Sequence, residues 1–94
     1  MISSEAVVVD LGSHLTIADV ERVQQQLEGL LAGGHNFALD AAQLEKIDTA
    51  GLQLLCSLKK TLQNAESELN WKEASPTFIK SAYLMGVNHF LQLV

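Results

Sequence analysis

Residues 36–55 read NFALDAAQLEKIDTAGLQLL, and this stretch decides the fold. Its apolar residues 37–40 end on a carboxylate, which is typical of a buried strand that reaches the edge of a sheet. A polar loop follows, and then Asp48 and Thr49 precede a long apolar run. Both residues favour a helix start, because a short side-chain oxygen accepts from the free backbone N–H groups of a first turn. The stretch therefore predicts a strand, a loop and a helix over about residues 49–64, whose N-terminus displays a carboxylate and a hydroxyl.

The predicted helix is apolar over a wide arc near its N-terminal end. Its stripe consists of Gly51, Leu54, Leu55, Leu58 and Leu62, broadened by Leu52 and Cys56. A helix of this kind is either deeply buried or covered by a partner at that end. Gly51 opposes helix propensity. We expect Gly51 to let a partner approach the backbone, and close packing against a neighbouring strand is the alternative.

A spacing motif in this stretch points to a family. The motif consists of Leu39-Asp40, seven further residues, and then Asp48-Thr49-Ala50-Gly51 before a leucine. It resembles the signature of STAS domains, which include bacterial anti-sigma-factor antagonists and the tails of sulfate transporters. In the antagonists the motif is usually Asp-Ser-Ser-Gly or Asp-Ser-Thr-Gly, and a partner kinase phosphorylates the residue after the aspartate. Thr49 occupies that position here, and Ala50 replaces the second hydroxyl residue.

The variant Asp-Thr-Ala-Gly is more similar to two other branches of the family. One is the accessory subunit of the phospholipid-trafficking ABC transporter of Gram-negative bacteria, and the other is a stand-alone STAS protein found beside chemotaxis kinases. The resemblance covers nearly the whole chain. The C-terminal residues 75–93 resemble the chemotaxis-linked and sigma-regulatory proteins somewhat better than the transporter subunit.

The resemblance implies a non-enzymatic module that docks on a larger protein. The residues implied to bind the partner are Asp48, Thr49, Ala50, Gly51, Leu52 and Gln53, with Ser13 and His14 from an adjoining loop. In the leading interpretation the partner is a signalling protein, either an anti-sigma/kinase factor or a chemotaxis kinase assembly, and Thr49 is a phosphorylation switch. In the alternative the partner is the ATPase of a phospholipid-transport ABC system, and the domain is a constitutive cytoplasmic subunit.

Length and composition limit the class of protein. The 94 residues are enough for one domain, 1–94, and a hydrophobic content of 48% is ordinary for a globular fold. The net charge of −5 and the lack of a basic run argue against nucleic acid or an anionic membrane as the main partner. No apolar run is long enough to span a bilayer, and the N-terminus does not resemble a signal peptide. With a single cysteine, Cys56, the sequence favours a reducing, cytoplasmic setting.

The segments on either side of the central stretch predict further strands and helices. Three valines in residues 6–11 predict a strand buried on both faces or nearly so, and Leu15 begins a second, very short strand. Residues 16–19 read as a capping box, and a helix should follow, with one apolar side made of Ile17, Val20, Val23, Leu27, Leu30 and Leu31. Glycines 33 and 34 should end it.

The C-terminal part of the chain predicts a fourth strand over residues 69–74, which contains Trp71 as a core or partly buried residue. Ser75 and Pro76 are a strong helix start, and the buried stripe of that helix should be Phe78, Ile79, Ala82 and Met85. The order β-β-α-β-α-β-α predicts an α/β class, in which helices pack on a small mixed β-sheet. The STAS fold implied by the motif has this form.

Most other reactive groups do not form a recognisable catalytic pattern. The three histidines are far apart and have no ligand spacing with a cysteine or carboxylate, so we expect no metal and no cofactor. The phosphate-binding motif of nucleotide hydrolases is missing. Asp10 and Asp40 both end predicted strands and should meet at one sheet edge, where solvation is the better interpretation than acid–base work. Cys56 should be a buried, inert thiol.

Overall fold

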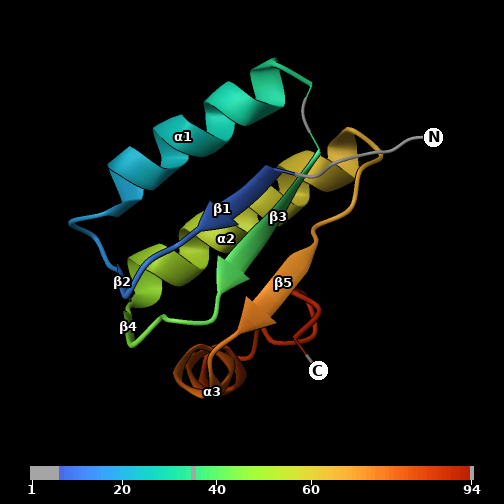
Figure 1. Cartoon of the computed structure of the whole chain (residues 1–94). Helices are drawn as coiled ribbons and strands as arrows, with labels where there is room; N and C mark the ends of the chain where they lie inside the picture. The colour runs from blue at the N-terminus through green and yellow to red at the C-terminus, as the bar shows by residue number, and fades with distance from the viewer. Residues whose placement is uncertain (1–6, 35, 94) are drawn as a thin grey trace.

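The computed structural model describes residues 7–34 and 36–93. The elements in chain order are β1 (Val7–Asp10), β2 (His14–Leu15), α1 (Val20–Ala32), β3 (Phe37–Ala41), β4 (Lys46–Ile47), α2 (Thr49–Asn64), β5 (Trp71–Ala74) and α3 (Pro76–Leu84) (Figure 1). The predicted α/β class is confirmed. The short strand β4 lies where the polar loop was expected to end, and the sequence analysis predicted no strand there.

The strands form two small sheets, and every pairing among the described residues is parallel. One sheet has the order β1-β3-β5, and the other pairs β2 with β4. The sequence analysis expected one mixed sheet. The chain runs through α1 between β1 and β3, and through α2 between β3 and β5. A helical crossover returns the chain to the end where it started, so the next strand runs in the same direction.

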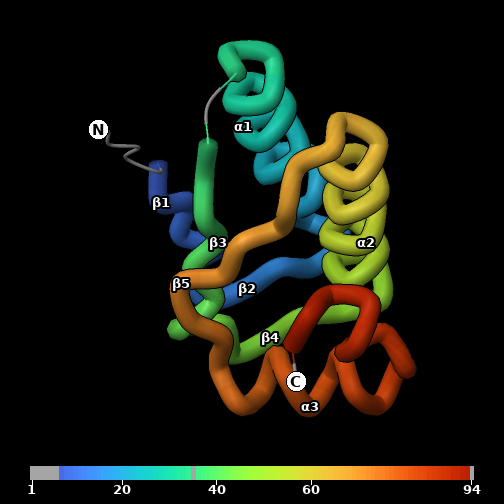
Figure 2. Tube along the Cα trace, turned by 90° about the vertical axis from the view of Figure 1, so that its right-hand side faces the viewer, coloured from blue at the N-terminus to red at the C-terminus, as the bar shows by residue number. Residues whose placement is uncertain are grey.

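The helices α1 and α2 lie on one side of the three-stranded sheet, and α3 lies across one end of the molecule (Figure 2). This arrangement corrects the prediction for β1. Val9 is 1% exposed, but Val7 is 40% and Val8 is 49% exposed. β1 is an edge strand of a sheet that helices cover on one face, so Val9 is buried toward the helices and Val8 is exposed on the other face. Val7 shares the face of Val9 but is exposed at the start of the strand.

The core is built mainly from leucines, which come from α1, α2, β2, β3, the loops and the C-terminal turns. Its largest fully buried side chains are Phe78, Leu15, Leu39, Leu44, Leu55, Leu91, Val9 and Val23. Trp71 is partly buried, as predicted, and its ring lies 5.1 Å from that of Phe78 in a tilted pair. The Trp71 indole N–H also donates to the Leu91 carbonyl at 2.8 Å, which fixes the C-terminal turns against β5.

Two of the three predicted helix starts are formed as local sequence rules require. Asp48 caps α2 by accepting from the Gly51 N–H, and Ser75 caps α3 by accepting from the Phe78 N–H. The third start differs. The Asp19 carboxylate accepts from the Thr16 backbone N–H at 3.0 Å, and this bond closes a turn over residues 16–19 just before α1 begins at Val20.

Three apolar residues that the sequence analysis assigned to buried stripes are exposed. Ile17 is 70% exposed because it lies in that turn, outside α1. Ile79 and Met85 are 39% and 51% exposed, because α3 buries only a narrow stripe made of Phe78 and Ala82. Cys56 is half-buried and not fully buried, and this partial burial raises the pKa of its thiol.

Candidate functional site

Gly51 is an internal packing residue, and the expectation that a partner approaches its backbone is wrong. Gly51 is buried in the first turn of α2. A Cβ there would overlap the Leu15 carbonyl oxygen and come within 2.9 Å of Ile47 Cγ1. The missing side chain therefore lets α2 lie directly against β2 and β4, which was the alternative that the sequence left open.

The Asp48 carboxylate joins two segments that are 31 residues apart in the chain. Its Oδ1 accepts from the Gly51 N–H at 2.9 Å, and its Oδ2 accepts from the Ile17 N–H at 2.9 Å. These backbone donors, with Gly51 first and Ile17 second, lower the pKa of Asp48 below its ordinary value of 3.8. Asp48 therefore holds the turn before α1 against the N-terminus of α2.

Thr49 is the first residue of α2 and its side chain is exposed, as the sequence predicts. Its neighbours differ in accessibility. Ala50 is half-buried and Gln53 is exposed, but Leu52 is only 4% exposed and belongs to the core. Leu52 and Gly51 were both expected to contact a partner directly, and burial removes them from the accessible surface.

Ser13 and His14 lie beside this region, as expected, but they also have structural roles. The Ser13 carbonyl accepts from the backbone N–H groups of Glu45 and Lys46 at 2.9 and 3.1 Å, which holds the β3–β4 loop. The Ser13 hydroxyl and the His14 Nδ1 are 2.9 Å apart, and His14 is exposed on β2 next to Lys46 of β4.

Ile17 is the residue of this surface that sequence reasoning missed. Its turn is fixed from two sides, because Asp48 binds the Ile17 N–H and Asp19 binds the Thr16 N–H and hydroxyl. Ile17 thus presents a large apolar side chain, 70% exposed, on a turn whose backbone is held in place. Helical spacing assigned it to a buried stripe, and the capping box expected over residues 16–19 supported this by placing Ile17 in the first helical turn. In the structure α1 begins only at Val20, so the sequence held no signal for the exposure of Ile17.

A shallow groove of about 270 Å³ runs between this turn and α2. It is lined by Ile17, Val20, Gln24, Ala50, Gln53, Leu54 and Ser57, none of which is charged. We call the exposed side chains of Thr49, Gln53 and Ile17, together with this groove, the α2 N-terminal surface. It brings together an exposed hydroxyl, neutral polar groups and apolar side chains from two elements.

The remaining candidate groups have ordinary structural environments. Asp10 and Asp40 are direct register partners of β1 and β3, so the two strand ends do meet. Each carboxylate accepts from the backbone N–H two residues later, at 2.8 Å for Gly12 and 3.0 Å for Ala42, and so closes its own turn. Within residues 7–34 and 36–93 there is no cluster of three metal-ligating side chains.

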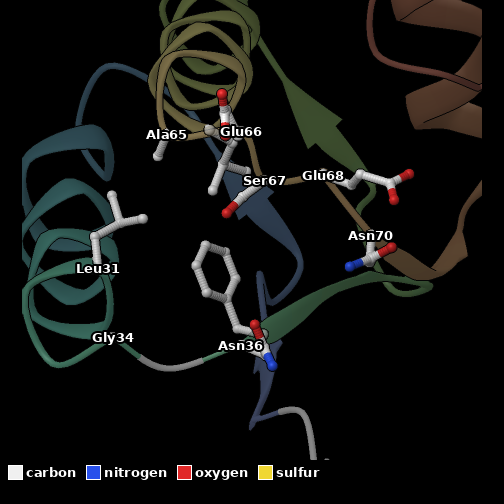
Figure 3. A pocket seen from close by; sticks show the side chains of 10 residues that line it. Leu31, Gly34, Asn36, Ala65, Glu66, Ser67, Glu68 and Asn70 are labelled. Atoms are coloured by element: carbon white, nitrogen blue, oxygen red, sulfur yellow. The ribbon is translucent and has the colours of Figure 1, made fainter.

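A second hollow, of about 620 Å³, lies where α2 leads into β5 (Figure 3). Leu31 and Ser67 border it, and Glu68 extends away from it in Figure 3. None of the residues that line it is one that the motif implies. Its polar lining residues are exposed and make no hydrogen-bonded cluster in the described chain, so we assign it no function.

The fold and the Asp48–Gly51 turn define a small α/β domain that carries a motif-bearing helix N-terminus. A family model described as "Mlab, STAS domain" matches residues 1–94, and the chain therefore belongs to the STAS domain family. STAS domains are generally protein-interaction modules. Comparisons with curated proteins and with solved structures find no match. None of the described helices has the length and apolar character needed to cross a membrane.

Proposed function

We propose that this protein is a non-enzymatic STAS module that regulates a signalling partner in the cytoplasm through the α2 N-terminal surface, with Thr49 as a phosphorylation switch. The partner in this proposal is an anti-sigma/kinase factor or a chemotaxis kinase assembly. The observation that carries the proposal is the juxtaposition of the exposed Thr49 with Ile17, which is 70% exposed on a turn that Asp48 fixes. The apolar side chain supplies contact area, and the hydroxyl supplies a position where charge can be added.

The proposed switch rests on the effect of a dianion at a contact surface. A phosphate on Thr49 would lie at the N-terminus of α2, where the helix dipole and free N–H groups favour negative charge. The domain itself should therefore tolerate the modification. The phosphate would also add about −2 charge to an interface whose groove residues are neutral, and this opposes closure on a partner.

A second candidate function is a constitutive subunit of a phospholipid-transport ABC system. Ala50 favours it, since the motif here keeps only one hydroxyl residue. Both candidate functions use the same surface, but they differ in whether Thr49 is phosphorylated. The signalling role requires a population of chains phosphorylated on Thr49, and the constitutive role requires an unmodified chain in a stable complex with an ATPase.

The test is quantitative capture of partners by the tagged chain from native lysate, followed by binding measurements with the purified partner. We expect Ile17→Ser to weaken binding about tenfold or more, because burial of such a side chain is worth about 1.5–3 kcal/mol. Thr49→Glu should weaken binding more than it lowers the melting temperature, because the charge is tolerated at the helix end and uncompensated in an interface. Val8→Ser, a change at an exposed apolar residue of β1, is the matched control.

The identity of the captured protein and mass analysis of Thr49 then separate the two candidates. Unchanged binding by both Ile17→Ser and Thr49→Glu would overturn the proposed surface. A large fall in melting temperature for Thr49→Glu with unchanged binding would show that the residue acts in folding alone.

A further inference from the structure

The C-terminal part of the chain differs in charge from the rest. All 11 Asp and Glu residues lie at or before Glu73. From residue 74 onward, Lys80 is the one lysine or arginine, and there is no aspartate or glutamate. A protein of net charge −5 thus has one segment, α3 with the turns that follow it, that is not acidic.

The same segment holds most of the exposed apolar surface that the structure describes. Seven large apolar residues are exposed, and four of them lie on α3 or at its C-cap: Ile79 at 39%, Tyr83 at 69%, Leu84 at 71% and Met85 at 51%. Figure 1 shows α3 at the bottom of the molecule, beyond the end of β5. Exposed apolar residues that gather in this way indicate a contact surface, since scattered ones need no explanation.

A groove of about 620 Å³ lies between α3 and the C-terminal turns. It is lined by Pro76, Ile79, Lys80, Tyr83, Asn88, His89 and Leu93. The turns that form one wall are held in place, because the Leu91 carbonyl accepts from the Trp71 indole and the Gln92 side chain accepts from Lys59 Nζ at 2.9 Å. The groove therefore has fixed walls and needs little ordering when it is filled.

We propose that this α3 face docks an amphipathic segment of a protein partner, with apolar side chains in the groove and carboxylates beside them. Lys80 and His89 lie among the apolar lining residues, and none of the described residues that line the groove is an aspartate or glutamate. The apolar groups supply contact area, and the Lys80 ammonium selects acidic flanks on the bound segment.

Charge argues against two alternative occupants of the α3 face, a second copy of the chain and an anionic membrane. A two-fold interface joins the same patch of each copy, so a second copy packed through α3 would offer Lys80 no carboxylate side chain from the described lining residues. An anionic membrane needs a cluster of basic residues, and this face offers one lysine on an otherwise acidic chain. The face shares no lining residue with the α2 N-terminal groove, so the inference does not rest on the proposed function.

The test uses two fluorescent helical peptides of about 15 residues, since shorter helices are marginal in water. Both carry the same leucine stripe, and the other positions are glutamate in one peptide and lysine in the other. We expect the acidic peptide to bind at least about tenfold more tightly than the basic one, and the ratio to fall as salt screens the charges.

Variants locate the binding. Ile79→Ser and Tyr83→Ser should each weaken the acidic peptide at least about fivefold, as expected for apolar side chains that line the groove. Lys80→Glu should abolish or reverse the preference for the acidic peptide. Lys72→Glu, an exposed position on β5 with the same change in net charge, should keep it, and Val8→Ser and Ile17→Ser should bind as the parent chain does. Melting temperatures confirm that each variant is folded.

Several results would overturn the inference. These are no binding of the acidic peptide, equal binding of the two peptides, or the same loss in Lys72→Glu as in Lys80→Glu. Sedimentation that shows a dimer broken by Tyr83→Ser would assign the face to a second copy. Flotation with phosphatidylglycerol vesicles that depends on Tyr83 would assign it to a membrane.

Discussion

At the scale of single residues, Gly51 sets how closely α2 approaches β2. Its position explains why the first turn of α2 contains a residue of poor helix propensity, because any side chain at residue 51 would meet the Leu15 carbonyl. Thr49 lies two residues earlier in the same turn, so the close contact at Gly51 also sets where Thr49 lies relative to β2 and β4.

We expect Gly51→Ala to lower the free energy of unfolding. Overpacking costs about 1–3 kcal/mol, and the gain in helix propensity of up to about 1 kcal/mol offsets only part of it. Urea melts of the isolated domain measure the change. The matched control is Gly29→Ala, because a Cβ at Gly29 in α1 meets nothing within 4 Å. That variant should be as stable as the parent or more so, and equal stabilisation by both changes would contradict the packing role of Gly51.

Asp48 gives the domain a predictable response to acid. Its pKa is lowered in the folded state, so its contribution to stability is complete above the ordinary value of 3.8 and is lost as the pH falls through the lower, folded pKa. We expect the melting temperature of the parent chain to exceed that of Asp48→Ala at pH 7, and the difference to shrink below about pH 4. Thermal melts at pH 7, 4 and 3 test this. The lowered pKa of Asp19 acts in both proteins and cancels in the comparison.

At the scale of elements, the helix starts were predictable and the exposed faces were not. The bounds of α2, Thr49–Asn64, were predicted as observed, because its N-cap Asp48 acts on the backbone of the turn that directly follows it. β4 is two residues long and exists because Leu15 pairs with Ile47, which no local pattern reveals. The candidate site follows the same rule. The motif located Thr49, but the burial of Gly51 and Leu52 and the exposure of Ile17 depend on contacts with distant segments.

Ser75 joins three elements and offers a test at this scale. Its hydroxyl donates to the Leu44 carbonyl at 2.6 Å and accepts from the Phe78 N–H at 3.1 Å, and the residue is buried. Ser75→Ala removes the cap of α3 and leaves the Leu44 carbonyl without this donor. We expect a loss of about 1–3 kcal/mol in the free energy of unfolding. Thr77→Ala, at an exposed position of the same helix turn, should change stability by no more than about 0.5 kcal/mol.

At the scale of the whole molecule, the C-terminal turns complete the hydrophobic core. Leu91 is 0% exposed, and its backbone carbonyl holds the Trp71 indole. The turns are therefore part of the folded unit, although they follow the last helix.

We expect Leu91→Ala to destabilise the domain by about 2–5 kcal/mol, the range for deletion of a buried leucine side chain. This is a large share of the roughly 5–15 kcal/mol that holds a small domain together. Denaturant melts followed by Trp71 fluorescence and by circular dichroism should show one shared transition. Separate transitions for the two signals would show that the turns unfold independently of the core.

The uneven distribution of carboxylates also determines how the molecule orients on a charged support. An anion-exchange resin attracts the part of the chain that contains all 11 acidic residues. It does not attract the side chains of α3, because α3 contains no aspartate or glutamate. Molecules adsorbed from low salt should therefore contact the resin less often through the side chains of α3 than through those of the acidic elements.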